Sequence, residues 1–354
     1  MSDSKALIAL SGGVDSSVAA HLILQQGFSC IGATMRLRPS EAGCGSAKDI
    51  DDARSVAERL GIPYHVFDFQ REFRSMVIDR FVHSYEAGLT PNPCVNCNRY
   101  LKFDRLLACA LQLDCNYIVT GHYAQVVRSE ENGRYLLKKA ADPAKDQSYF
   151  LYSLTQYQLA HTLLPLGGYT KEHIREVAQK LGLINAEKHD SQDICFIPDG
   201  NYKAFLEAYA GKSYPKGNFL DTSGNVVGTH CGAVGYTLGQ RKGLGLAMGA
   251  PVYVCCKDMQ ANTVTVGSND ALFHKSLRAD DWNWFPFPAL DVPMRVSAKV
   301  RSRQIEQPAT AYPEDNGTVR IVFDEAQRAI TPGQAVVLYD GDLVVGGGTI
   351  TEVL

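Results

Sequence analysis

The stretch that decides the fold is Ser11-Gly12-Gly13-Val14-Asp15-Ser16-Ser17, which lies between an apolar run at residues 6–10 and a helix-like run at residues 17–25. Adjacent glycines let a backbone approach phosphate closely, and serine hydroxyls and the first amides of a helix donate hydrogen bonds to phosphate oxygens. A capped helix start could also explain such a turn, but the full seven-residue string is more specific. The stretch is therefore predicted to be a phosphate-binding turn. It lacks the Gly-Lys-Ser/Thr ending of a Walker loop.

Around this loop, strand-like and helix-like runs alternate up to about residue 200. This alternation predicts an α/β fold with a doubly wound parallel sheet, in which ligands bind at the carboxyl ends of the strands. Residues 149–183 carry leucines at helical spacing and are expected to form a helical extension. The strand-like runs are residues 6–10, 30–37, 64–69 and 117–120, and the helix-like runs are residues 17–25 and 50–60.

The second part of the chain has a different pattern, because short β-like runs are separated there by turn signals. Three domains are expected: a first domain at residues 1–205 that includes the helical extension, a small central β domain at 206–273, and a C-terminal β barrel at 274–354. Strand candidates are residues 251–255, 263–266, 294–300, 318–323 and 335–339.

Composition limits the class of protein. The chain has 354 residues, 45% of them apolar and 21% charged, which is typical of a packed globular protein. No apolar run approaches the roughly 20 residues that cross a membrane, so a cytoplasmic protein without membrane contact is expected. The formal charge of −3 argues against an extended nucleic-acid-binding surface, although a local basic track remains compatible with it.

Three of the ten cysteines stand out by context. Cys94 and Cys97 belong to the stretch Pro91-Asn92-Pro93-Cys94-Val95-Asn96-Cys97-Asn98-Arg99, and Cys195 belongs to Asp193-Ile194-Cys195-Phe196-Ile197. A helix start and nearby cations both favour the thiolate form of a cysteine. Three thiols allow a nucleophile paired with a sulfur carrier, three ligands of an iron–sulfur cluster, or part of a zinc site. Zinc is the weakest hypothesis, because no fourth ligand has the usual spacing.

Taken together, the motifs resemble the tRNA-specific 2-thiouridylases (the MnmA/TrmU family) over essentially the whole chain. The first motif is similar to the PP-loop of the N-type ATP pyrophosphatases, which split ATP into AMP and pyrophosphate. Besides this loop, the matching motifs are Pro91-Asn92-Pro93-Cys94-Val95-Asn96-Cys97-Asn98, Gly121-His122-Tyr123-Ala124, Lys145-Asp146-Gln147-Ser148-Tyr149-Phe150-Leu151, Asp193-Ile194-Cys195-Phe196-Ile197 and Gly239-Gln240-Arg241-Lys242-Gly243-Leu244-Gly245.

The resemblance implies an enzyme that replaces the C2 oxygen of the wobble uridine, U34, by sulfur in the tRNAs for Lys, Glu and Gln. AMP is first attached to that oxygen, and a sulfur nucleophile then displaces it. In the family pattern Cys195 carries a persulfide from a donor protein, which is a cysteine desulfurase or its relay. Cys97 attacks this persulfide and leaves a Cys97–Cys195 disulfide. A monomer is expected.

The binding residues follow from the same resemblance. ATP, with Mg²⁺ screening the pyrophosphate, would be held by Ala9, Leu10, Ser11, Gly12, Gly13, Val14, Asp15, Ser16, Met35 and Gly121. The flipped target base would contact Asn92, Pro93 and Cys94, and the rest of the tRNA would contact His122, Lys145, Asp146, Gln147, Arg301, Ser302 and Gln334.

Cys94 departs from part of the family, in which some members carry an aspartate that is a candidate general base. Either another group takes the proton here, or Cys94, Cys97 and Cys195 hold a [4Fe-4S] cluster that carries the sulfur. The persulfide route is slightly favoured. An amide-forming ligase would not explain the two-cysteine loop, and an RNA-binding scaffold would not explain an intact phosphate loop.

Overall fold

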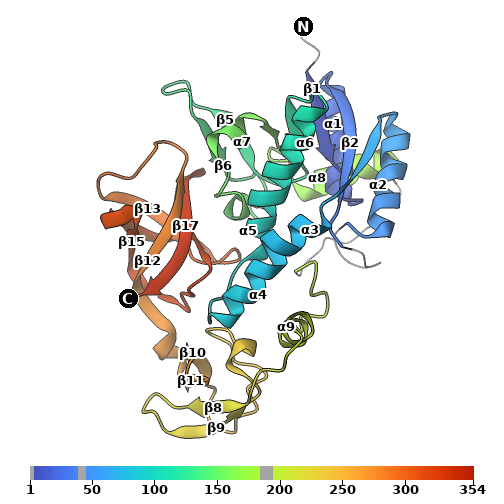
Figure 1. Ribbon diagram of the computed structural model, residues 1–354. Coiled ribbons are helices and arrows are strands. Elements are labelled where there is room, and N and C mark those ends of the chain that lie inside the picture. Colours follow the sequence, from blue (N-terminus) through green and yellow to red (C-terminus); the bar gives the residue numbers. More distant parts are fainter. Residues whose placement is uncertain (1–3, 39–44, 184–193) are drawn as a thin grey trace.

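The structure, a computed structural model, describes residues 4–38, 45–183 and 194–354 (Figure 1). Its N-terminal part contains a five-stranded sheet in the order β3-β2-β1-β4-β7, and every pairing in it is parallel. The predicted α/β class is therefore confirmed. The strands are β1 (Lys5–Ala9), β2 (Ser29–Arg36), β3 (Tyr64–Asp68), β4 (Tyr117–Val119) and β7 (Thr162–Leu163).

The order of the strands fixes where a ligand can bind. The chain leaves β1 towards β2 on one side, and β4 pairs with β1 on the other side. Ligands of such sheets bind beyond the carboxyl ends of the strands at this change of direction. The loop at residues 10–13 and the segment after β4 both start at this edge.

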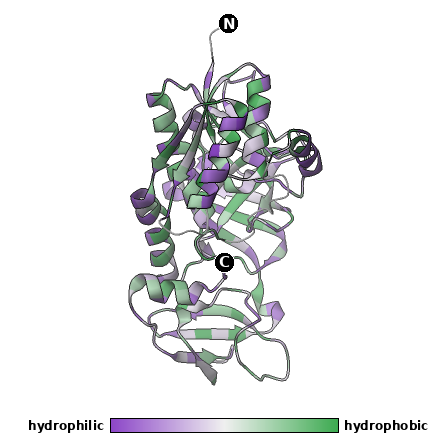
Figure 2. Ribbon diagram, turned by 90° about the vertical axis from the view of Figure 1, so that its right-hand side faces the viewer, coloured by the Kyte–Doolittle hydropathy of each residue, from purple (hydrophilic) through white to green (hydrophobic). Residues whose placement is uncertain are grey.

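Both faces of the sheet are buried, because successive side chains of a strand point to opposite faces. Ala6 and Ile8 belong to one hydrophobic cluster, and Leu7 between them belongs to another. Figure 2 shows that the helices of this domain carry both hydrophobic and hydrophilic residues, as helices with one face on a sheet do.

The described helices of this domain connect and cover the strands. Two of them continue through π-helical segments at Arg74–Ile78 and Cys97–Arg105. None of the helices in the described residues is long and apolar enough to cross a membrane. The helices are α1 (Val14–Gln25), α2 (Ala47–Leu60), α3 (Gln70–Phe73), α4 (Asp79–Glu86), α5 (Pro93–Asn96), α6 (Leu106–Gln112), α7 (Gln156–Ala160), α8 (Lys171–Lys180) and α9 (Tyr202–Ala210).

The segment at residues 149–183 differs from the helical run expected for it. It contains the short helix α7 and the helix α8, but Thr162 and Leu163 between them form strand β7. These two residues pair with Ile118 and Val119 of β4, so hydrogen bonding to the sheet outweighs the helical spacing of the leucines.

The two remaining parts are built from strands. The central part has the sheet order β10-β11-β8-β9, with Phe219, Val254, Val264 and Val266 in its core. The last six strands form a closed antiparallel barrel, because β12 pairs with both β15 and β17. The expected strands at residues 251–255, 263–266, 294–300, 318–323 and 335–339 are present, with ends that differ from the expected ones by up to five residues. The strands are β8 (Gly217–Leu220), β9 (Val226–His230), β10 (Tyr253–Asp258), β11 (Thr263–Gly267), β12 (Phe273–Trp284), β13 (Met294–Lys299), β14 (Gln307–Pro313), β15 (Val319–Arg328), β16 (Ala335–Asp340) and β17 (Leu343–Val353).

A hairpin of the N-terminal domain extends the barrel sheet. Its strands are β5 (Gln125–Arg128) and β6 (Tyr135–Lys138), and Lys138 of β6 pairs with Leu343 of β17. Arg134, next to β6, donates hydrogen bonds to the backbone oxygens of Phe285 (2.7 Å) and Trp284 (3.1 Å). The barrel is therefore attached to the N-terminal domain by backbone pairing as well as by side chains.

Candidate active site

The predicted phosphate loop leaves β1 and enters α1. Gly12 has φ +69°, and a Cβ atom there would lie 2.7 Å from the backbone oxygen of Asp49, so only glycine fits. The helical hydrogen bonds begin with Ser17 N–H donating to Gly13 O (3.3 Å). The backbone amides of the first turn before Ser17 have no acceptor within the helix and can face an anion.

The serine side chains of the loop stabilise its shape. The Ser16 hydroxyl donates to Gly13 O (3.1 Å) and accepts from the Ser11 amide (3.1 Å), while the Ser17 hydroxyl donates to Gly13 O (2.9 Å). The sequence suggested that these hydroxyls bind phosphate. In the structure Ser16 and Ser17 are buried and hold the loop, whereas Ser11 is exposed, with its hydroxyl 3.1 Å from that of Ser16.

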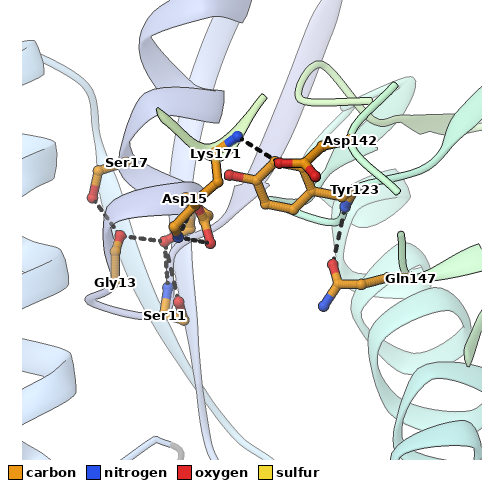
Figure 3. A network of polar contacts seen from close by, with 9 residues as sticks. Ser11, Gly13, Asp15, Ser17, Tyr123, Asp142, Gln147 and Lys171 are labelled. Carbon is orange, nitrogen blue, oxygen red and sulfur yellow. Dashed lines mark hydrogen bonds and ion pairs between the residues drawn. The ribbon is translucent and has the colours of Figure 1, made fainter. Parts of the chain in front are cut away.

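Asp15 is held by Tyr123, which belongs to the motif at residues 121–124, and by Lys171, which the sequence did not single out (Figure 3). Both carboxylate oxygens of Asp15 accept from Lys171 Nζ at 2.8 Å, and Oδ1 also accepts from the Tyr123 hydroxyl at 2.8 Å. Lys171 is 5% exposed and starts α8, where its backbone amide donates to Asp142 (3.0 Å). Lys171 and Asp15 are 156 residues apart, so no local pattern in the sequence indicated this ion pair.

The ends of two other strands support the loop. The Thr34 hydroxyl at the end of β2 donates to Leu10 O (2.7 Å) and accepts from the Tyr64 hydroxyl (2.7 Å). A Cβ atom on Gly121 would lie 2.7 Å from the Ser16 amide nitrogen, so the second residue after β4 must be glycine. Of the other predicted nucleotide-binding residues, Leu10 and Val14 are buried, and Ala9 and Met35 are half-buried.

His122 is an internal residue in this structure. Its Nδ1 atom lies 2.7 Å from the Thr120 hydroxyl, its Nε2 atom lies 3.5 Å from Lys102 Nζ, and its ring packs on Phe103. Burial, and then the nearby Lys102 ammonium, lower the pKa of His122 well below its ordinary value. His122 is therefore a neutral imidazole at neutral pH.

The motif at residues 145–147 orders the segment that follows β4. The Gln147 side chain accepts from the Tyr123 amide (2.9 Å), and the Gln147 amide donates to Tyr123 O (2.8 Å). Asp146 accepts hydrogen bonds from Ala140 and Ser148. Lys145 is half-buried. Asp146 and Gln147 thus hold the backbone of neighbouring segments in place by accepting hydrogen bonds from its amides.

The first two thiols of interest lie at the start of a helix. Asn92 caps α5 by accepting from the Cys94 amide (3.1 Å), and Pro93 is buried at the first helical position. Cys94 is exposed and Cys97 is half-buried. Cys97 also begins the π-helical segment, a geometry that is frequent at functional sites.

The position of Cys195 is fixed mainly by the next residue, Phe196, which packs into the hydrophobic core. Phe196 is 3% exposed and packs edge-on against Phe73 and Phe81, with ring centroids 5.8 and 5.2 Å apart. Arg38, just after β2, donates to Cys195 O (3.4 Å). Cys97 and Cys195 are both half-buried against the same hydrophobic cluster. Asp193, the first residue of the predicted motif, lies outside the described residues.

The three thiols do not form a recognisable metal site. Within the described ranges, which include Cys94, Cys97 and Cys195, no group of three or more His, Cys, Asp or Glu side chains is arranged to hold a metal ion. These residues therefore do not fit an iron–sulfur cluster in this conformation. Cys30 is one of the cysteines for which the sequence predicts no role. Burial raises its pKa to about 11, so this thiol is a poor nucleophile.

Two of the residues predicted in the barrel make contacts within the chain. One guanidinium nitrogen of Arg301, Nη2, donates to Leu238 O (3.1 Å), Ala329 O (3.2 Å) and Thr331 Oγ1 (2.7 Å). Gln334 donates to Thr90 O (2.7 Å), just before the Cys94 loop. Ser302 is half-buried.

Comparisons with known proteins agree across the whole chain. The family model described as "tRNA methyl transferase HUP domain" matches residues 4–199. A "tRNA methyl transferase PRC-barrel domain" matches residues 203–268, and an "Aminomethyltransferase beta-barrel domain" matches residues 274–350.

Curated relatives match over nearly their full length, and each is described as a tRNA-specific 2-thiouridylase. The protein of Acetivibrio thermocellus is 49% identical over 99% of this chain and 100% of its own. That of Clostridioides difficile is 48% identical over 99% of both chains, and that of Moorella thermoacetica is 51% identical over 98% and 99%. Solved structures are more distant: a 4-thiouridine synthetase–RNA complex with bound ATP has a TM-score of 0.36 at 18% identity, covering 55% of this chain and 45% of its own.

Proposed function

The chain belongs to the tRNA-specific 2-thiouridylase family, and we propose that it replaces the C2 oxygen of U34 by sulfur in the tRNAs for Lys, Glu and Gln. The observation that carries this proposal is about 50% identity to 2-thiouridylases over nearly the full length. It is supported by a phosphate-type loop and half-buried thiols in one domain. The expected setting is the cytoplasm, with a monomeric enzyme.

The first step activates the uridine. The C2 oxygen attacks the α-phosphorus of ATP, a P–O bond breaks, and pyrophosphate leaves. The first-turn amides of α1 and the exposed hydroxyl of Ser11 donate to the phosphate oxygens, and Met35 and Gly121 border the nucleotide. Mg²⁺ usually binds through phosphates and one or two carboxylates, so Asp15 is the loop residue that would help to hold it, and the bound cation would screen the negative charge of the pyrophosphate.

The second step transfers sulfur. The terminal sulfur of a persulfide on Cys195 attacks C2, and AMP leaves with the former C2 oxygen. The Cys97 thiolate then attacks the Cys195 sulfur, which releases 2-thiouridine and leaves a Cys97–Cys195 disulfide. A thiol reductant supplies two electrons to restore both thiols. The persulfide comes from a cysteine desulfurase or a relay protein.

The residues proposed to contact tRNA differ in their surroundings: some are exposed, and others are bound by partners within the chain. Cys94 is exposed, as a residue that touches a flipped base must be, and Asn92 and Pro93 set the position of its loop. Lys145 is the cation of its motif. His122, Arg301 and Gln334 have partners within the chain, so contacts from them would need a rearrangement when tRNA binds. The same holds for Asp146 and Gln147. Ser302 completes the proposed set.

The test is to replace each thiol separately. We expect Cys97→Ala and Cys195→Ala to reduce 2-thiouridine formation roughly 10³-fold or more, because each removes a bond-forming sulfur. The affinity for tRNA should stay within about twofold, since neither thiol carries charge to the phosphate backbone. Thiolated nucleosides are measured by mass spectrometry with a persulfide donor. Cys256→Ala, an exposed thiol of the central part, is the matched control.

Thiolation at the parental rate by either variant would contradict the disulfide step. The assay is repeated anaerobically with inorganic sulfide, alongside iron analysis of the protein. Stoichiometric iron together with sulfide-dependent activity would favour the cluster route over the persulfide route.

A further inference from the structure

The segment that carries Cys94 and Cys97 is fixed at both ends by the C-terminal barrel. We call residues 90–99 the thiol segment. At its first residue, the Thr90 amide donates to Pro332 O (2.9 Å) and Thr90 O accepts from Gln334 Nε2 (2.7 Å). Both backbone groups of Thr90 are therefore held by one turn of the barrel, four residues before Cys94.

That turn is itself closely fitted. Gly333 has φ +89°, and a Cβ atom there would lie 2.9 Å from both the Thr90 nitrogen and the Leu89 Cβ atom. The Gly333 amide donates to Ile350 O, and Ile350 donates back to Gln334 O, both at 2.8 Å. The turn is anchored to β17, so it can act as a fixed support for Thr90.

The other end of the thiol segment is held by an ion pair. Arg99 binds both carboxylate oxygens of Asp281, and one of these hydrogen bonds measures 3.1 Å. Asp281 has φ +50° and lies where the pairing of β12 with β17 shifts register, so the barrel backbone is bent to present this carboxylate. The Asp281 carboxylate raises the pKa of Arg99.

A third contact of the thiol segment is made by Asn98, the residue between Cys97 and Arg99. Asn98, which is 2% exposed, donates to Phe150 O (3.1 Å). The neighbouring Tyr149 hydroxyl donates to Ala335 O (2.9 Å), next to Gln334. Thr90 and Arg99 thus contact the barrel directly. Asn98 is connected to it through the adjacent residues Tyr149 and Phe150.

We propose that the C-terminal barrel is a positioning element for the reactive thiols, with Asp281 and the Pro332–Gly333–Gln334 turn as positioning residues. The proposal rests on the function proposed above, since it assumes that Cys97 reacts. Both partners of the Arg99–Asp281 pair are partly exposed, at 32% and 51%, so the pair contributes little to global stability. The pair instead fixes the position of the thiol segment. This position matters for the reaction, because displacing a reacting group by about 1 Å can reduce a rate by about 10²-fold.

The experiment uses two variants with matched controls in the full-length protein. Asp281→Asn removes the charge and keeps a residue that tolerates positive φ. Asp324→Asn is its control, since Asp324 forms a similar bidentate pair with Arg295 on the same barrel. Gly333→Ala introduces the close contact with Thr90. Gly341→Ala is its control, because Gly341 has φ +55° but nothing lies within 4 Å of an added Cβ atom.

The first readout is alkylation by iodoacetamide without tRNA or ATP, resolved by peptide mass spectrometry. Cys94 is already exposed and serves as the internal reference for the half-buried Cys97. We expect the Cys97-to-Cys94 rate ratio to rise at least about fivefold in Asp281→Asn and Gly333→Ala, and to stay constant in both controls. The second readout is single-turnover thiolation, expected to fall about 10- to 100-fold at unchanged tRNA affinity.

Each outcome decides a different question. An unchanged alkylation ratio in Asp281→Asn overturns the positioning role, even if Gly333→Ala fails to fold. A loss confined to tRNA affinity also overturns it, because Asp281 and Gly333 would then be tRNA-binding rather than positioning residues. If the parental protein forms no 2-thiouridine, the proposed function fails, while the alkylation ratio still decides whether the barrel positions Cys97.

Discussion

Asp15 places a negative charge inside a loop that is proposed to bind phosphate. An isolated carboxylate there would repel the ligand, but the Lys171 ammonium lies 2.8 Å from both of its oxygens. The pair is mostly shielded from solvent, since the Lys171 side chain is 7% exposed and that of Asp15 is 28% exposed. At the scale of single residues, Lys171 therefore makes an acidic loop compatible with an anionic substrate.

Replacing this lysine tests the compensation. We expect Lys171→Met to lower ATP affinity at least about tenfold, and to lower the free energy of unfolding by about 2 kcal/mol. This is less than for a fully buried pair because Asp15 retains some solvent contact. Lys171→Arg should recover much of the ATP affinity, and equilibrium dialysis with labelled ATP measures it. The double variant Asp15→Asn/Lys171→Met should regain stability. Parental ATP affinity in Lys171→Met would contradict the argument.

At the scale of elements, the candidate active site lies where α1 and the end of β4 meet. The structure leaves no room for a side chain at Gly121, because its Cβ atom would lie 2.7 Å from the Ser16 nitrogen and 2.8 Å from the Asp15 carbonyl carbon. Both contacts are with backbone, which cannot rotate away. The position of the phosphate loop thus depends on a strand that follows it by about a hundred residues.

Gly121→Ala is expected to displace the loop without disrupting the sheet. Pyrophosphate release should fall about 10²-fold, because the first-turn amides of α1 move away from the phosphate. Affinity for tRNA should change little. Pyrophosphate is measured by a coupled assay, with Gly168→Ala as the control, since nothing lies within 4 Å of an added Cβ atom there. If Gly121→Ala releases pyrophosphate at the parental rate, the loop does not depend on the end of β4.

At the scale of the whole molecule, one hydrophobic cluster contains residues of both the N-terminal domain and the barrel, although each part also has a cluster of its own. Leu137, Tyr149 and Tyr152 belong to the same cluster as Val337 and Tyr339. Asn283 of the barrel also donates to Tyr152 O (2.6 Å) and Leu154 O (2.9 Å). Neither part buries its apolar surface fully without the other, so the two parts should unfold together.

This expectation can be measured with signals native to the chain. Both tryptophans, Trp282 and Trp284, lie in β12, so their fluorescence reports on the barrel. Far-UV circular dichroism at 222 nm reports mainly on the helices of the N-terminal domain. We expect the two signals to share one urea midpoint, as a single cooperative transition requires. Asn283→Ala should lower this midpoint, and separate midpoints in the parental protein would show that the parts are independent.

Much of the architecture could be predicted from the sequence, because it is encoded in short windows. Apolar runs of four to eight residues predicted the parallel sheet, the glycine-rich stretch predicted the turn between its first strand and first helix, and turn signals predicted several barrel strands. Strand β7 could not be predicted this way, because Thr162 and Leu163 become a strand only by pairing with β4. The motifs also predicted the family, which the full-length relatives confirm.

By itself, the sequence determined which chemical groups the protein has: a glycine- and serine-rich turn between a strand and a helix, and cysteines in unusual contexts. Only the tertiary structure decided what surrounds them. Lys171 is 156 residues from Asp15, Asp281 is 182 from Arg99, and Gln334 is 244 from Thr90. Local patterns reflect the constraints of one helix or strand, whereas charge compensation and positioning arise between segments that meet only when the sheet, the central part and the barrel have packed together.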